Sequence, residues 1–160
     1  MQIQEQALMC LFMRSLIKRV PMVQPFAFEK FSENIASADK PTAAFTALHE
    51  RWTKVDAQEK IQTRVLFLDE KQSAFGQTII NTKKLGKAHL REVFRIFKDQ
   101  NAASIVLGKN KESAYLAPNE EEKNHVRRIN EMAQAMNMPV ADYLHLSRND
   151  FISFAHNRLF

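Results

Sequence analysis

Apolar side chains recur along the chain with two different periods, one typical of helices and one typical of strands. Over residues 2–19 they fall near a 3.6-residue period, which predicts an unusually apolar first helix. Pro21 and Pro25 follow it, and proline ends a helix because it lacks a backbone N–H and clashes with the preceding turn. A second helix is expected over about 41–54, where Pro41 suits a first helical position.

Two further helices are predicted in the second half of the chain. His89–Gln100 is amphipathic, with apolar residues on one face and basic residues on another. Asn119 can cap a helix that runs to about Asn137, because Glu122 three residues later completes a capping box.

Short apolar runs bounded by polar residues predict five strands, at 64–69, 74–81, 104–107, 143–146 and 151–154. The first two of these runs would form a hairpin. Residues 21–41 are expected to be an irregular connection with a short helix around Glu29–Ile35, and 108–118 a loop. The order of elements therefore indicates a mixed α/β domain after a helical lead.

Composition narrows the classes of function. The chain has 160 residues with 45% apolar and 26% charged side chains, which is globular composition. Its three glycines form no phosphate-binding loop, and its single cysteine, Cys10, excludes a disulfide framework or a multi-cysteine zinc site. The net charge of +5 permits an acidic partner without requiring one.

The apolar run at 7–13 bears on localisation. It is too short to cross a bilayer, which takes about 20 apolar residues. No basic segment precedes it, as one would in a secretory signal. We therefore expect a cytoplasmic protein with no membrane partner, and we expect Cys10 to be a small buried apolar residue.

Several motifs in the C-terminal part resemble those of one family. They are VLFLD at 65–69, REV at 91–93, NAASIVL at 101–107, DYL at 142–144, SF at 153–154 and Leu159. This set resembles the JAB/MPN domain of the RadC family, in the JAMM metalloprotease superfamily. The resemblance implies an α/β (α+β mixed) fold, a JAB/MPN-like (cytidine-deaminase-like) mixed sheet flanked by helices. It divides the chain into an N-terminal helix and irregular connection, 1–36, and a RadC-like JAB/MPN domain, 37–160.

The resemblance also implies where a zinc site would lie. The family holds zinc with two histidines of a His-x-His-Pro-Ser-Gly motif and an aspartate eleven residues after the second. Placed without gaps, the histidines fall on Lys109 and Lys111 and the aspartate on Glu122, with the motif serine on Ser113. A lysine that is protonated near pH 7 has no lone pair for zinc. We expect one of the two lysines to pair with Glu122 instead.

The catalytic glutamate of the family would lie on the strand at 74–81. Gln77 and Thr78 occupy that strand, which has no carboxylate, and neither side chain is a general base at neutral pH. No His-x-His occurs elsewhere; His145, for example, is expected at a surface or edge. We therefore expect no catalytic residue, no metal and no cofactor, and a catalytically inactive domain that binds a protein partner or acts as a scaffold. A hydrolase with a different metal arrangement remains an alternative.

Basic residues support another alternative, a DNA-associated RadC-like protein. The candidates for phosphate contacts are Lys83, Lys84, Lys87, Arg91, Arg95 and Lys98. A solvated helix face gives the same pattern. A smaller cluster, Lys123, Arg127 and Arg128, has the same two interpretations.

The helix expected over 2–19 is apolar all round at positions 7–13, so one neighbouring surface would not cover it. Either it packs between the second helix and the JAB-like domain, or it joins two copies of the chain in a homodimer.

Overall fold

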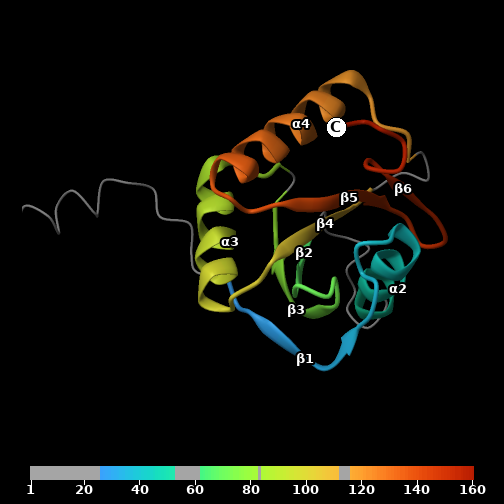
Figure 1. Cartoon of the computed structure of the whole chain (residues 1–160). Helices are drawn as coiled ribbons and strands as arrows, with labels where there is room; N and C mark the ends of the chain where they lie inside the picture. The colour runs from blue at the N-terminus through green and yellow to red at the C-terminus, as the bar shows by residue number, and fades with distance from the viewer. Residues whose placement is uncertain (1–25, 53–61, 83, 112–115) are drawn as a thin grey trace, which may run out of the picture.

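The structure is a computed structural model that describes residues 26–52, 62–82, 84–111 and 116–160. These residues form one six-stranded sheet with three helices (Figure 1). In chain order the elements are β1 (Glu29–Ile35), α2 (Pro41–Trp52), β2 (Thr63–Leu68), β3 (Ala74–Ile80), α3 (Lys87–Asp99), β4 (Ser104–Asn110), α4 (Glu120–Ala135), β5 (Val140–Leu146) and β6 (Phe151–Ser153).

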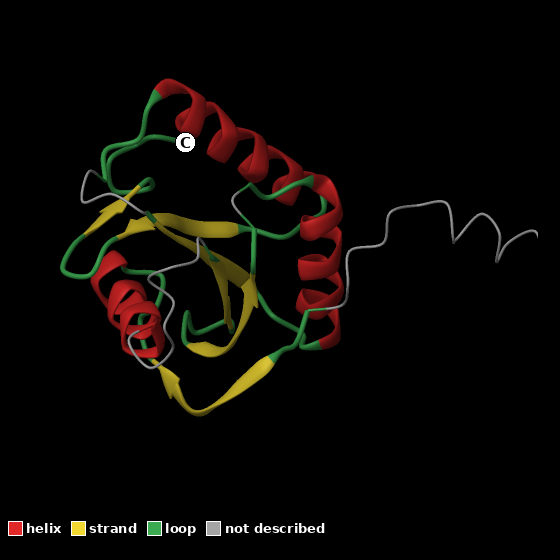
Figure 2. Cartoon of the chain, turned by 180° about the vertical axis from the view of Figure 1, so that it is seen from behind, coloured by secondary structure: helices red, strands yellow, loops and turns green. Residues whose placement is uncertain are grey.

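The sheet is mixed and has the strand order β1-β3-β2-β4-β5-β6. Only β4 and β5 pair in parallel, and α4 makes the crossover between them, as a parallel pair requires. Helices α3 and α4 cover one face of the sheet and α2 covers the other (Figures 1 and 2). This arrangement confirms the predicted mixed sheet flanked by helices.

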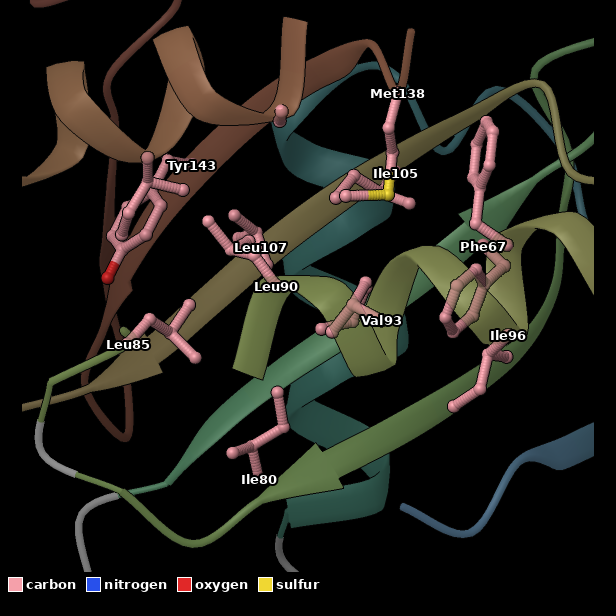
Figure 3. Packing of buried hydrophobic residues seen from close by; sticks show 14 of the residues in the cluster. Phe67, Ile80, Leu85, Leu90, Val93, Ile96, Ile105, Leu107, Met138 and Tyr143 are labelled. Carbon is pink, nitrogen blue, oxygen red and sulfur yellow. The ribbon is translucent and has the colours of Figure 1, made fainter. Parts of the chain in front are cut away.

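The larger core lies between the sheet and helices α3 and α4. Strands β2, β4 and β5 contribute Phe67, Leu107 and Tyr143, which are fully or almost fully buried (Figure 3). Helix α3 buries an apolar stripe against them, and α4 buries Val126 and Ile129. Amphipathic helices of this kind are held mainly by the burial of one face.

A second core lies under α2. Leu48 of this helix packs among Leu66, Val106 and Leu144, which alternate along their strands with the residues of the larger core. The helix approaches the sheet closely at Gly108, where an added Cβ would lie 2.6 Å from Leu48 Cδ1. Glycine at this position therefore lets α2 rest directly on β4.

Two element predictions were wrong. The segment Glu29–Ile35 is not a short helix but the edge strand β1, which pairs antiparallel with β3. Only Phe31 of β1 is buried, so the sequence carries little strand periodicity, and pairing with β3 decides the conformation. Strand β4 also continues to Asn110 instead of ending at Leu107, because its last residues pair with both β2 and β5.

Within the described residues, the other predicted helices and strands are confirmed, with boundaries shifted by a few residues. The helix expected over 2–19, including Cys10, lies outside the described residues. Among the helices that are described, none is long and apolar enough to cross a membrane.

A buried carboxylate joins the last two strands to the C-terminal turn. Asp142 accepts hydrogen bonds from the hydroxyl of Ser153 at 2.6 Å and from the backbone N–H groups of Tyr143 and Ala155 at 2.7 and 3.0 Å. Burial raises the pKa of Asp142, although these hydrogen bonds act in the opposite direction. The aspartate and serine belong to the DYL and SF motifs, so both motifs have a structural role here.

We expect Asp142→Ala to lower the free energy of unfolding by about 2–3 kcal/mol, because it leaves two buried donors and one partly buried donor without an acceptor. Asp99→Ala, which removes an exposed carboxylate, should cost less than about 1 kcal/mol. Urea unfolding followed by circular dichroism measures both. Equal losses in the two variants would contradict a structural role for Asp142.

Candidate functional site

Strand β4 and helix α4 together position the residues onto which the zinc motif falls. Along β4, Ile105 and Leu107 point into the larger core, so Lys109 and then Lys111 follow on the same face. Helix α4 returns over this face and brings its first turn next to the end of β4. The predicted capping box fixes this turn: Asn119 Oδ1 accepts from the Glu122 N–H at 2.8 Å, and Glu122 Oε1 accepts from the Asn119 N–H at 3.3 Å.

Lys111 and Glu122 form an ion pair, as predicted. Lys111 Nζ lies 2.5 Å from Glu122 Oε2, and the two side chains are 16% and 22% exposed. Burial raises the pKa of Glu122, but hydrogen bonds from Lys111 and Asn119 and the charges nearby outweigh it, so the pKa is lowered overall. An ammonium therefore neutralises the carboxylate that aligns with a zinc ligand of the family.

His145 on β5 is the third member of this cluster, and the prediction that it lies at a surface or edge was wrong. Its side chain is 1% exposed because β5 is flanked by β4 and β6 and covered by α4. Nδ1 donates to the Leu116 carbonyl at 3.2 Å, and Nε2 lies 3.6 Å from Glu122 Oε2. Burial lowers the pKa of His145 to about 4, so the imidazole is neutral at pH 7.

Lys109 is half-buried and lies opposite Thr63 of β2 and His145 of β5. Burial lowers its pKa, and the positive charges of Lys111 and Lys84 act in the same direction, whereas Glu122 opposes them. Within the four described ranges, the Lys109 ammonium makes no hydrogen bond or ion pair. Lys111 is therefore neutralised by Glu122, whereas Lys109 has no such partner among the described residues.

Strand β3, to which the resemblance assigns the family's catalytic glutamate, carries no acidic residue. The carboxylate of Glu29 on β1 nevertheless contacts this strand. Gln77 Nε2 donates to Glu29 Oε2 at 3.1 Å, and the hydroxyl of Thr78 donates to the carbonyl of Ala27 at 2.7 Å. Gln77 and Thr78 point to opposite faces of the sheet, since they are neighbours on a strand. Sequence analysis missed Glu29 because it assigned this segment to a helix.

The structure divides the predicted phosphate-contacting residues. Lys87, Arg91, Arg95 and Lys98 form an exposed stripe on α3. Arg95 is partly neutralised by ion pairs with Glu92 at 2.6 Å and Asp99 at 2.8 Å. Two further candidates, Lys83 of this set and Ser113 of the zinc motif, lie outside the described residues.

Lys84, by contrast, interacts electrostatically with residues of β4 and α4. Its charge lowers the pKa of both Lys109 and His125. His125 is on α4, one turn after Glu122, and sequence analysis did not select it. Because this electrostatic interaction joins the β3–α3 connection to α4, no spacing along the chain reveals it.

The side chains present here do not fit zinc. In the ranges that the structure describes, no three His, Cys, Asp or Glu side chains come together in a group that could hold a metal ion. Zinc sites in proteins use such side chains as ligands. Lys109 and Lys111 stand where the motif alignment puts the two histidines, and Lys111 pairs with Glu122.

Replacing His145 by glutamine should flatten the dependence of stability on pH. The folded-state pKa is lowered, so the stabilisation is complete above the unfolded value of about 6.5 and is lost as pH falls towards 4. From pH 7.5 to pH 5 the wild type should lose about 2 kcal/mol more than His145→Gln. Urea unfolding at a series of pH values measures this. Parallel curves for the two proteins would show that His145 does not titrate as the structure indicates.

Comparison with known proteins supports the same family as the motifs. The family model for the RadC-like JAB domain matches residues 38–159. The UPF0758 protein YkfG of Escherichia coli is 28% identical over 126 residues, which cover 75% of this chain and 80% of that protein. The UPF0758 protein tlr1707 of Thermosynechococcus vestitus is 32% identical over 91 residues, 56% of this chain. The match covers 36% of tlr1707, so the chain spans only part of such longer relatives. The chain belongs to the RadC-like JAB domain family.

Proposed function

We propose that this domain is a catalytically inactive member of its family, which works as a binding or scaffold module and not as a zinc hydrolase. The observation that carries the proposal is the cluster of Lys111, Glu122 and His145. The motif alignment assigns Lys111 to a zinc-ligand position of the related metalloproteases, and its ammonium pairs with Glu122, the carboxylate assigned to another. A catalytic zinc needs about three protein ligands and an open position for water.

The side chains of the same cluster are also poorly suited to act as a general base for hydrolysis without a metal. Glu122 is held by the helix cap and by Lys111, and its lowered pKa makes it a poor base. His145 is buried and donates its Nδ1 proton to a backbone carbonyl. Strand β3, on which the resemblance puts the catalytic glutamate, carries Gln77 and Thr78, which do not accept a proton at neutral pH. These features support binding over catalysis.

For the partner, a protein is the first candidate and a nucleic acid the second. The exposed stripe Lys87, Arg91, Arg95 and Lys98 on α3 favours the nucleic acid, because aligned cations can follow a phosphate backbone. The ion pairs of Arg95 with Glu92 and Asp99 weaken that case. Binding to a DNA duplex across a range of salt concentrations separates the two, since contacts with phosphates weaken steeply as salt rises.

We also propose that residues 2–19 join two copies of the chain, because this segment is apolar beyond one helix face. The wild type should be dimeric at tens of micromolar, and the double variant Leu8→Glu, Phe12→Glu should be a folded monomer. Sedimentation equilibrium measures both masses. A monomeric wild type would remove the dimer.

Metal content is the direct test of the proposed function. After expression with added zinc, the wild type should contain no stoichiometric zinc. The triple variant Lys109→His, Lys111→His, Glu122→Asp restores two imidazoles and the shorter carboxylate, and should bind about one zinc per chain. Elemental analysis of gel-filtered protein measures both.

The matched control is Lys30→His, Lys98→His, which adds two histidines on exposed positions of β1 and α3. It should gain no zinc. One zinc per chain in the wild type, lost in Glu122→Ala, would overturn the proposal.

A further inference from the structure

The edge strand β1 and its neighbour β3 run side by side over only part of their length. Their pairing begins where Glu29 lies opposite Gln77, whereas β3 continues to Ile80. The chain before Glu29 turns towards α3, where Phe26 stacks on His89 with ring centroids 6.2 Å apart. Within the described ranges, the end of β3 therefore has no strand beside it at this edge of the sheet.

A pocket of about 160 Å³ lies where the two strands separate. It is lined by Ala27, Glu29, Gln77, Thr78 and Ile79. This volume is about ten times what one water molecule needs. It is smaller than the roughly 300–1,000 Å³ of pockets that hold whole small-molecule ligands. The pocket is therefore sized for one small group, such as the end of a side chain.

The amide of Gln77 in this lining is only half satisfied. The residue is 1% exposed, and its Nε2 donates to Glu29 Oε2 at 3.1 Å. Its Oε1 is also buried and has no hydrogen-bond partner in the described part of the chain. The amide cannot be reversed, because a carboxylate only accepts and must face the NH₂ group. The unpartnered atom is thus an acceptor, and a buried acceptor without a donor is unfavourable.

Glu29 adds a negative charge to the same pocket. Among the residues that the structure describes, its carboxylate makes no ion pair. Arg64 of β2 lies on this face of the sheet, but it donates to the Leu48 carbonyl at 3.1 Å, so α2 holds it. The hydroxyl of Thr78 already donates to the Ala27 carbonyl. The side chains of the pocket therefore present acceptors and negative charge.

A ligand for this pocket must be a cation that donates hydrogen bonds. Ca²⁺ and Mg²⁺ take about six or more oxygen ligands, which Glu29 and Gln77 do not supply. A guanidinium binds best to both oxygens of a free carboxylate, but Gln77 already uses one of them. An ammonium has three donors that point in different directions, so it can contact the Glu29 carboxylate and the Gln77 oxygen together.

We propose that Glu29 and Gln77 form a binding site for an alkylammonium group, such as the end of a lysine side chain of a protein partner. The apolar stem of the ligand would lie against Ile79 and Ala27. The inference deepens the proposed function, on which it rests for a protein partner, by naming the group that the partner presents. The site lies on the α2 face of the sheet, whereas Lys111 and Glu122 lie on the other face, so the two proposals can fail separately.

The test is a titration of the full chain with methylammonium at constant ionic strength, followed by NMR chemical shifts. Shifts should concentrate at the side-chain amide of Gln77 and the backbone amide of Ile79. Glu29→Gln, at an exposed position, removes the charge but keeps an acceptor, and should weaken binding about tenfold. Gln77→Leu should weaken it about threefold, since it removes one neutral acceptor.

The matched control is Glu33→Gln, which removes the same charge from an exposed position four residues further along β1. It should bind methylammonium as the wild type does. Equal weakening in Glu29→Gln and Glu33→Gln would overturn the site. Tetramethylammonium has the charge but no N–H donor, so binding as tight as that of methylammonium would overturn it too.

The outcomes also separate this site from the proposed function. Absence of any shift at Gln77 in a zinc-free wild type, at millimolar methylammonium, would overturn the inference alone. Stoichiometric zinc in a wild type that still binds methylammonium would overturn the proposed inactivity alone.

A lysine derivative with both backbone ends blocked distinguishes the two sources of the ammonium. If it binds more tightly than methylammonium and Glu29→Gln weakens it, the site takes a lysine side chain. If the two bind equally, the ligand is a small amine. Both results support an ammonium site.

Discussion

The pairing of β4 with β2 on one side and β5 on the other is the constraint on which the rest of the domain depends. It places β4 inside the sheet with helices over both faces, so alternate residues face different layers: Val106 faces α2, and Leu107 faces α3 and α4. The parallel pairing with β5 also requires a crossover, which α4 provides over the second of these faces. The end of β4 and the start of α4 must then meet, and this junction is where Lys111 contacts Glu122.

At that junction, Lys111 and the helix cap satisfy the Glu122 carboxylate. In the zinc enzymes of the superfamily a dication would neutralise this group, whereas here Lys111 supplies one positive charge and the helix cap supplies a backbone N–H. A partly buried pair of this kind contributes little net stability, about 1 kcal/mol, because desolvation offsets much of the attraction. Its main effect is to fix Glu122 beside His145, which burial keeps neutral.

Much of the fold and the ion pair could be predicted from the sequence, because both depend on local patterns. The periodicity of α3, the capping box of Asn119 and Glu122, and the ungapped motif all lie within short segments. The strand β1 and the burial of His145 could not be predicted. Both depend on pairing with strands distant in sequence, so neither alternation nor neighbouring residues indicated them. The electrostatic interaction of Lys84 with His125 was missed for the same reason.

The two lysines differ in what they imply. A neutral side chain at either position would avoid the cost of burying a charge. Lys111 has a structural reason to be charged, since Glu122 needs a partner. Lys109 has none within the described part of the chain, and the charges of Lys84 and Lys111 oppose it. Within the described residues, Lys109 is thus a charge that burial penalises and that no ion pair offsets.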